Sequence, residues 1–526
     1  MTVDEHRMPA VLATIAQIWA ALLGSCPERD SSFFEAGGDS LTAVRLLARI
    51  RRELGIELTL TDIITHPQLA TLAALAERRR AVADAPADPE PVITAAGRHP
   101  VNANQAARLM RARRALAAGT GGWNTTTSVI AAGYRIEGDL DQAALSAAVA
   151  TVAGRHDGLR TAFSPDDFTQ WVVPGAVVRL QTVAAGGPPL GELATRPFDL
   201  GAGVLARFLL RRVGPREHEF WFGVEHLVAD RAAVRILLEE ISQVYRAAVT
   251  GASPPGLPEP LPNHAVGYLE DRYCASAAGR RAYDWWARYA GDRPLWPALD
   301  YPGSRQPRGD EWEHGVTHRV EIEPDVVAGL AAHARQDGSL WLLVSLAALI
   351  GAVAERTGAD RVPVLVPIGN RQLPGTESVV SFLTTNLALD VPGLREAEPL
   401  DALKQVRELL VDALTHAAYP AQRLIRELTP QDWGHPRRHP ILYLDLDSTV
   451  ACDLELAGCT VTDLPEPDGA VGLGIWIWMR AAAGGMRFTL RHPRGYLPPE
   501  ESAELAQAIR RGIVRLAGAL SRGEHR

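Results

Sequence analysis

One heptapeptide pairs a histidine with an aspartate at a spacing that could do chemistry. It reads Glu225-His226-Leu227-Val228-Ala229-Asp230-Arg231 and follows residues 220–224, an apolar run typical of a buried strand. A helix is predicted from Ala232 onward. His226 would emerge at the end of the strand, where an imidazole can act as a base or bind a reacting group. A histidine there is also commonly a structural hydrogen-bonding residue, so position alone leaves both interpretations open.

A serine in a glycine-rich turn is the second candidate. Ser40 follows Gly37, Gly38 and Asp39 and precedes Leu41, where an amphipathic pattern predicts a helix. The N-terminus of a helix carries partial positive charge, which favours a phosphate group. The same position also suits a plain N-cap that satisfies free backbone amides.

Helical periodicity surrounds this serine. Apolar residues of the segment 8–24 fall on one helical face, and another helix is predicted through residues 69–75. The chain then becomes polar and proline-rich, with residues 85–91 suited to an extended linker. We therefore predict a small all-α domain of four helices over residues 1–80 and a linker over residues 81–99.

The rest of the chain mixes helices with short strands. Residues 125–134, 220–224 and 362–366 are β-branched or apolar runs between helical stretches, which predicts an α/β or α+β fold. The glycine- and proline-rich residues 251–262 divide this region. We predict two portions, residues 100–262 and residues 263–526.

Composition narrows the classes of function. A chain of 526 residues exceeds one compact core, and a net charge of -8 argues against nucleic acid as a partner. The four cysteines show neither zinc spacing nor a disulfide framework, so we expect no metal site. There is no signal-like N-terminus and no run near the roughly 20 apolar residues of a membrane span. We expect a cytoplasmic protein without membrane association.

The surroundings of Ser40 resemble a known family. Residues 33–41, Phe-Phe-Glu-Ala-Gly-Gly-Asp-Ser-Leu, are similar to the peptidyl carrier proteins of nonribosomal peptide synthetases, a likeness that extends over residues 8–78. In that family the serine carries 4'-phosphopantetheine, whose thiol holds an aminoacyl or peptidyl thioester. The resemblance implies Ser40 as the attachment site, flanked by Asp39 and Leu41, and a phosphopantetheinyl transferase as a partner.

Residues 100–520 resemble the condensation domains of the same synthetases. Residues 155–163, Arg-His-Asp-Gly-Leu-Arg-Thr-Ala-Phe, fit the RHxxLRTxF element, and residues 367–371, Pro-Ile-Gly-Asn-Arg, match a later element ending in arginine. Residues 103–109 and 382–387 approximate two further elements with shifted spacing, so neither Thr385 nor Asn386 is assigned a catalytic role. The resemblance implies two chloramphenicol-acetyltransferase-like lobes around a V-shaped cleft.

The central family element, HHxxxDG, is present here as Glu225, His226, Asp230 and Arg231. The resemblance implies that His226 lies at the cleft centre, as a base for the acceptor amine or as a group that orients and stabilises the tetrahedral intermediate. It implies a structural role for Asp230, paired with an arginine for which Arg371 is the candidate.

Two residues depart from the family element. Glu225 could raise the affinity of His226 for a proton, or could accept a backbone hydrogen bond. Arg231 replaces a glycine that leaves room for the phosphopantetheine arm. Its side chain could narrow that channel, bind an acidic group of an acceptor, or turn to solvent. Both residues are candidates for controlling access of the substrate.

The leading functional hypothesis is a free-standing didomain of carrier and condensation domain that forms amide bonds. No adenylation or thioesterase segment is visible, so an adenylation enzyme would load the carrier in trans and other carrier domains would be partners. One alternative is a non-catalytic module that recruits enzymes to a carrier-bound peptide. Another is ester formation, in which the oxygen nucleophile needs a base more than an amine does.

Overall fold

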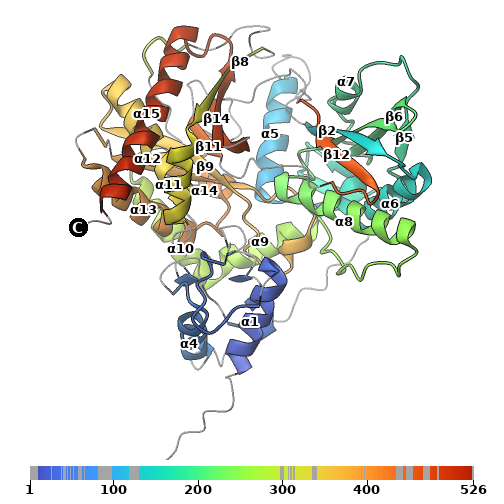
Figure 1. Ribbon diagram of the computed structural model, residues 1–526, viewed down its shortest axis with the longest axis horizontal. Coiled ribbons are helices and arrows are strands. Elements are labelled where there is room, and N and C mark those ends of the chain that lie inside the picture. The colour runs from blue at the N-terminus through green and yellow to red at the C-terminus, as the bar shows by residue number, and fades with distance from the viewer. Residues whose placement is uncertain are drawn as a thin grey trace, which may run out of the picture.

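The computed structural model contains a small helical domain and two α/β lobes (Figure 1). It describes residues 10–24, 26–36, 38, 43, 46–47, 49–50, 53–56, 58, 62–63, 66–80, 97–117, 129–295, 301–305, 307, 311, 314–334, 340–392, 394–395, 397–433, 442–445, 454–465, 474–482 and 485–523.

Within its described residues, the helical domain contains the helices α1 (Ala10–Leu23) and α4 (Leu69–Arg80). The apolar face predicted for the first helix is buried, with Ile15 and Trp19 fully enclosed. The Trp19 ring meets the Phe33 ring edge to face, with 5.0 Å between centroids. Leu414 of the neighbouring lobe packs against this core, so the helical domain contacts the rest of the chain.

The N-lobe is built on a five-stranded sheet in the order β12-β2-β7-β6-β5. Its strands are β2 (Val129–Gly138), β5 (Leu180–Thr182), β6 (Ala206–Gly214), β7 (Glu217–Glu225) and β12 (Cys459–Asp463). Helices α6 (Gln142–Arg155) and α8 (Arg231–Thr250) pack over one face, and the short α7 (Leu190–Ala194) packs against the other. Alternation along β7 sends Phe220 and Phe222 to the α6 and α8 side and Trp221 to the α7 side.

One strand of this sheet comes from the far end of the chain. Strand β12 pairs antiparallel with β2, Cys459 opposite Gly138 and Asp463 opposite Tyr134. The portion predicted to start at residue 263 therefore contributes an edge strand to the sheet of the N-lobe (Figure 1). The two lobes are thus joined by an exchanged strand as well as by contacts between them.

The C-lobe has a six-stranded sheet in the order β10-β9-β11-β13-β14-β8. Its strands are β8 (Gly315–Ile322), β9 (Arg361–Ile368), β10 (Thr385–Pro392), β11 (Leu442–Asp445), β13 (Ile475–Ala482) and β14 (Gly485–Pro493). Four helices cover one face: α11 (Pro324–Ala334), α12 (Leu340–Thr357), α13 (Pro399–Thr415) and α15 (Pro499–Gly523). The strand predicted at residues 362–366 is thus part of β9.

Helix α12 lies at the centre of the C-lobe core. It is the one helix among the described residues that is long and apolar enough to cross a membrane. Most of it is buried inside the lobe, where Leu343, Leu346 and Ile350 contact the sheet and the neighbouring helices. Its apolar sequence is accounted for by this packing.

The remaining elements connect the lobes and complete their edges. They are β1 (His99–Pro100), α5 (Ala103–Ala117), the 3₁₀ turns Asp157–Arg160 and Thr376–Ser378, β3 (Thr161–Ser164), β4 (Thr169–Val172), α9 (Ala265–Ala275), α10 (Ala277–Ala290) and α14 (Ala421–Leu428). Strands β1, β4 and β3 form a small separate sheet in that order.

Helix α5 lies between the two large sheets (Figure 1). Its first turn is held from three sides. The Ala103 amide donates to the Glu270 carboxylate on α9 at 2.8 Å, and Asn104 donates to the Thr384 carbonyl at 2.9 Å. Gln105 donates to the Leu227 carbonyl at 2.9 Å, in the turn after β7. Helix α5 therefore fixes that turn relative to the C-lobe.

Candidate active site

The histidine lies in the turn that joins β7 to α8. Strand β7 ends at Glu225 and α8 begins at Arg231, so His226 emerges from the end of the strand as the sequence predicts. The His226 Nδ1 is 2.8 Å from the Ala229 carbonyl oxygen. Because a carbonyl can only accept, Nδ1 carries the proton and Nε2 presents its lone pair. The Phe382 ring of the C-lobe packs against the imidazole, with 4.4 Å between centroids.

The imidazole is neutral at cellular pH. Burial lowers the pKa of His226 to about 4, and the positive charge of Arg108 adds to this effect. The hydrogen bond to Ala229 and the charge of Asp230 act in the opposite direction and are outweighed. Among the described residues no hydrogen bond engages Nε2, and a neutral ring can accept one there from a nucleophile, which an imidazolium cannot.

Asp230 connects the two lobes. It caps α8 by accepting from the Ala233 amide at 2.9 Å, and the two amino groups of Arg371 donate to its two oxygens at 3.0 and 2.8 Å. It also accepts from the Leu383 and Thr384 amides at 3.0 and 2.9 Å. Burial alone would raise the pKa of Asp230, but Arg371 and these amides hold it below its usual range.

Glu225 faces an arginine of α5. Its carboxylate is fully buried, and Oε1 lies 3.8 Å from Nε of Arg108. Burial lowers the pKa of Arg108 to about 10, although the charge of Glu225 opposes the change. The sequence left open that Glu225 raises the affinity of His226 for a proton. In the structure the pKa of His226 is instead lowered. Arg108 is thus an opposite charge that lies against Glu225.

Arg231 crosses from the N-lobe to the C-lobe. Its guanidinium lies 3.2 Å from a carboxylate oxygen of Asp445 on β11. The Arg231 side chain is 33% exposed and that of Asp445 15% exposed. The Arg231 side chain therefore does not extend freely into solvent, which was one of the three possibilities that the sequence left open.

The Arg231 to Asp445 ion pair is expected to contribute weakly to stability. Partly exposed pairs are worth about 1 kcal/mol or less, so a cycle of Arg231→Met, Asp445→Asn and the double variant should give a coupling energy of that size. Denaturant unfolding of the full chain measures it. The more exposed pair Arg246 and Glu455, at 2.7 Å, serves as the control and should show a coupling near zero. A coupling of several kcal/mol would contradict this weak contact.

Comparison with known proteins places this geometry in a family. The profile described as Condensation domain matches residues 110–443, and the one described as Phosphopantetheine attachment site matches residues 13–76. The first covers more than half of the chain. The chain belongs to the condensation-domain family. The segment before it is a carrier domain of the phosphopantetheine-binding type.

Individual relatives agree with this assignment. Phosphinothricin tripeptide synthetase PhsB of Streptomyces viridochromogenes is 28% identical over 97% of this chain, which spans 44% of that protein. Tyrocidine synthase 2 of Brevibacillus parabrevis is 27% identical over 82% of this chain, which spans 12% of that protein. The chain thus corresponds to less than half of each of these relatives.

Solved structures share the fold of the condensation domain. The X-domain from teicoplanin biosynthesis has a TM-score of 0.67 at 20% identity, over 82% of this chain and 97% of that one. The first condensation domain of the calcium-dependent antibiotic synthetase has a TM-score of 0.63 at 18% identity, over 81% and 97%. The fold is therefore the two-lobed, chloramphenicol-acetyltransferase-like one that the sequence implied.

The attachment motif of the carrier domain is only partly described. Ser40, Asp39 and Leu41 lie outside the described residues. Gly38 is described, and its amide donates to the Phe33 carbonyl at 2.9 Å. A Cβ on Gly38 would come within 2.3 Å of the Phe33 ring, so only glycine lets the loop approach this closely.

Sequence reasoning missed several residues around the histidine. Arg108 and Asp445 pair with the two residues that depart from the family element, and Phe382 covers the imidazole. One available signal was the arginines at positions 108, 111 and 114 of α5, whose spacing of three puts them on one side of the helix.

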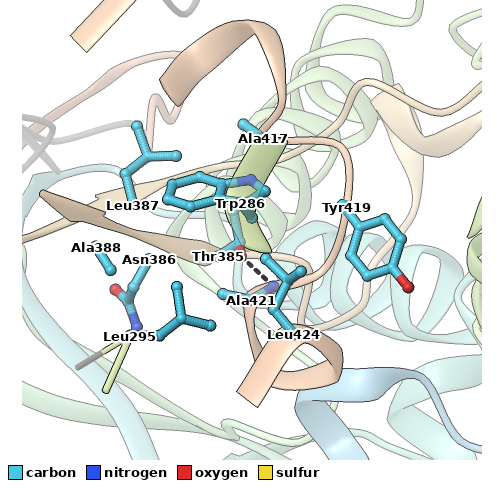
Figure 2. Close-up of a pocket in the computed structure, with 10 residues that line it drawn as sticks. All are labelled: Trp286, Leu295, Thr385, Asn386, Leu387, Ala388, Ala417, Tyr419, Ala421 and Leu424. Carbon is cyan, nitrogen blue, oxygen red and sulfur yellow. Dashed lines mark hydrogen bonds between the residues drawn. The ribbon is translucent and has the colours of Figure 1, made fainter. Parts of the chain in front are cut away.

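A small enclosure in the C-lobe is unrelated to this site. Figure 2 shows it beside β10, where the Trp286 side chain approaches Leu387 and the Ala421 amide donates to the Thr385 hydroxyl at 3.2 Å. Its volume is about 10 Å³, room for a water molecule at most. The Thr385 hydroxyl thus takes part in a contact with the start of α14.

Proposed function

We propose that this condensation domain forms an amide bond between a carrier-bound acyl donor and an amine, with His226 as the catalytic residue. The observation that carries the proposal is the neutral imidazole with its Nε2 lone pair available, held where the two lobes meet. Nonribosomal peptide synthesis is the activity of the family to which both domains belong.

The reaction joins the amine nitrogen to the acyl carbon and breaks the bond between that carbon and sulfur. The amine proton is finally transferred to the departing thiol. His226 Nε2 would accept a hydrogen bond from the attacking amine, orient its lone pair and receive the proton. An α-amine titrates near pH 8 and is already partly neutral, so alignment contributes as much as proton removal.

Asp230 and Arg371 are proposed to act on this reaction indirectly. Their ion pair joins the start of α8 to the loop that carries Leu383 and Thr384. Phe382, which packs on the imidazole, precedes these two residues. The pair therefore fixes both the turn that holds His226 and the ring that covers it.

The carrier domain binds 4'-phosphopantetheine covalently. We propose Ser40 as its attachment site, because the attachment-site profile matches residues 13–76 and the described part of the motif fits: Gly38 closes onto Phe33 with no space for a side chain. The arm, when bound, supplies the thiol that holds the acyl group. A phosphopantetheinyl transferase, an adenylation enzyme acting in trans and further carrier domains are the proposed partners.

Replacing Ser40 by alanine is expected to abolish modification of the carrier. Incubation of the full chain with a phosphopantetheinyl transferase and coenzyme A should add one phosphopantetheine to the wild type and none to Ser40→Ala, as read by intact mass. Ser31→Ala is the control and should be modified like the wild type. Modification of Ser40→Ala would place the attachment site elsewhere.

A second candidate function is recruitment of another enzyme to the carrier-bound peptide. Two observations favour it: Glu225 and Arg231 replace residues of the family element with charged side chains, and each contacts a charged partner. Among the structures of similar fold is a complex of the teicoplanin X-domain with OxyB. Under this alternative the chain would hold a partner enzyme near the peptide instead of forming an amide.

A further inference from the structure

Helix α5 carries two arginines, Arg108 and Arg111, whose spacing of three puts them on one side of the helix. Arg108 and Arg111 are close enough for their charges to affect each other, and Arg108 also acts on His226. Arg111 lies within electrostatic range of Tyr443 on β11. The charges of these two side chains therefore act on both the histidine turn and the C-lobe sheet.

The opposing sheet face presents aromatic and charged side chains. Leu442 and Leu444 of β11 point into the helix-covered core, so Tyr443 and Asp445 point to the other face. The Trp476 ring of β13 stacks on that of Tyr443 with 4.1 Å between centroids. In the next strand, Arg491 is the register partner of Trp476 and shares its face.

Charged side chains gather between these two surfaces. Four arginines define what we call the interlobe arginine cluster: Arg108, Arg111, Arg231 and Arg491. Two carboxylates of the described residues lie against this cluster. Glu225 lies against Arg108, and Asp445 lies against Arg231.

Arg111 differs from its neighbours. Among the described residues, no carboxylate lies within ion-pair distance of Arg111, and burial lowers the pKa of its guanidinium. Its side chain is nevertheless partly accessible. A desolvated cation that remains charged is costly unless an anion or strong acceptor compensates it.

A second polar group nearby also has no partner within the described part of the chain. The indole Nε1 of Trp476 is buried and donates to no acceptor there. Buried donors are normally satisfied, so such a group points to a ligand that brings an acceptor. The stacked rings of Tyr443 and Trp476 add an apolar surface suited to the methylene groups of a short aliphatic chain.

We propose that the interlobe arginine cluster binds an anionic side chain, a carboxylate, carried by the acyl donor or by the amine acceptor, with Arg111 as its main contact. This inference rests on the proposed function, because it describes the substrate of the same site. It makes Arg111 a specificity-determining residue, since a neutral substrate would leave its charge uncompensated.

Binding of matched acid and amide probes tests the proposal without any condensation. For the acceptor, the probes are the α-methyl esters of glutamate and glutamine. For the donor, they are glutaryl pantetheine thioester and its terminal carboxamide. Calorimetric titration of the full chain should show, in one arm, the acid binding about tenfold tighter than the amide. The arm that shows the preference identifies which substrate carries the charge.

Variants of α5 assign the preference to Arg111. Arg111→Met should remove it, and Arg111→Lys, which keeps the charge, should retain most of it. Arg113→Met is the matched control, because Arg113 is an exposed arginine of the same helix that contacts Phe168, and it should behave like the wild type.

Two results would overturn the proposal. One is equal affinity for acid and amide in both arms of the wild type. The other is an unchanged preference in Arg111→Met whose circular dichroism matches the wild type. A His226→Ala protein should keep the preference even if it forms no product, so failure of this inference and failure of the proposed function are told apart.

Discussion

Asp230→Asn is expected to lower the free energy of unfolding of the condensation domain by about 3–5 kcal/mol. The change leaves the buried Arg371 guanidinium without its compensating charge. In the structure, the two oxygens of Asp230 accept hydrogen bonds from Arg371 and from the amides of Ala233, Leu383 and Thr384. Asparagine has an NH₂ group in place of one of these oxygens and cannot accept a hydrogen bond there. Denaturant unfolding of the full chain, followed by tryptophan fluorescence, measures the loss.

A surface ion pair supplies the control for this variant. Asp139 lies 2.9 Å from Arg216, and both side chains are more than half exposed. Asp139→Asn is therefore expected to change the free energy of unfolding by less than about 1 kcal/mol. Equal effects of the two substitutions would contradict the structural role of Asp230.

The stability that Asp230 contributes has a defined pH dependence. Its pKa in the folded chain lies below the ordinary value of 3.8, so the folded state binds the proton less tightly than the unfolded state. This stabilisation is complete above pH 3.8 and is lost as the pH falls through the lower folded pKa. The wild type and Asp230→Asn should therefore become more similar in stability only in strong acid.

Local sequence patterns predicted the elements that position the site. Apolar residues 220–224 and the periodic segment after residue 231 predicted β7 and α8, because one buried strand and one amphipathic helix are each determined by residues close in the chain. The pairing of Asp230 with Arg371 came from family resemblance, and the structure places the two side chains in contact.

Long-range partners could not be predicted in the same way. Strand β12 has only five residues and joins a sheet whose other strands end before residue 226, and nothing in its own sequence identifies β2 as its neighbour. The contacts of Glu225 with Arg108 and of Arg231 with Asp445 likewise join residues far apart in sequence. Such pairs depend on how the two lobes pack, which a single sequence does not encode as a local pattern.

The charged departures from the family element now have defined surroundings. Glu225 and Arg108 form an ion pair beside the histidine, where burial, with the charge of Arg108 adding to it, lowers the pKa of His226. Arg231 lies against Asp445 and contributes to the interlobe arginine cluster. The substitutions therefore belong to one charged network that links the histidine turn to β11, and they are compatible with an acidic substrate as well as with recruitment.

His226→Ala is expected to reduce the rate of amide formation by about 100-fold or more. The variant removes the Nε2 acceptor that would orient the amine, while the Asp230 and Arg371 pair that holds the turn is kept. Mass spectrometry of the product formed from aminoacyl carriers measures the rate. His314→Ala, at an exposed histidine, is the control and should retain wild-type activity.

The pH dependence of the same reaction separates the possible roles of His226. With a pKa of about 4, its imidazole stays neutral between pH 6 and 8, so kcat/KM for an amine should rise toward pH 8 with ionisation of the acceptor alone. A rate that falls over this range would indicate an imidazolium acting as an acid, contrary to the structure.

An alcohol acceptor should give a kcat/KM that does not change with pH over this range. His226→Ala should lose more activity with the alcohol than with the amine, because an oxygen nucleophile needs the base more. If the wild type forms no product with its cognate partners, recruitment is favoured, because the neutral base at His226 would then not be used in catalysis.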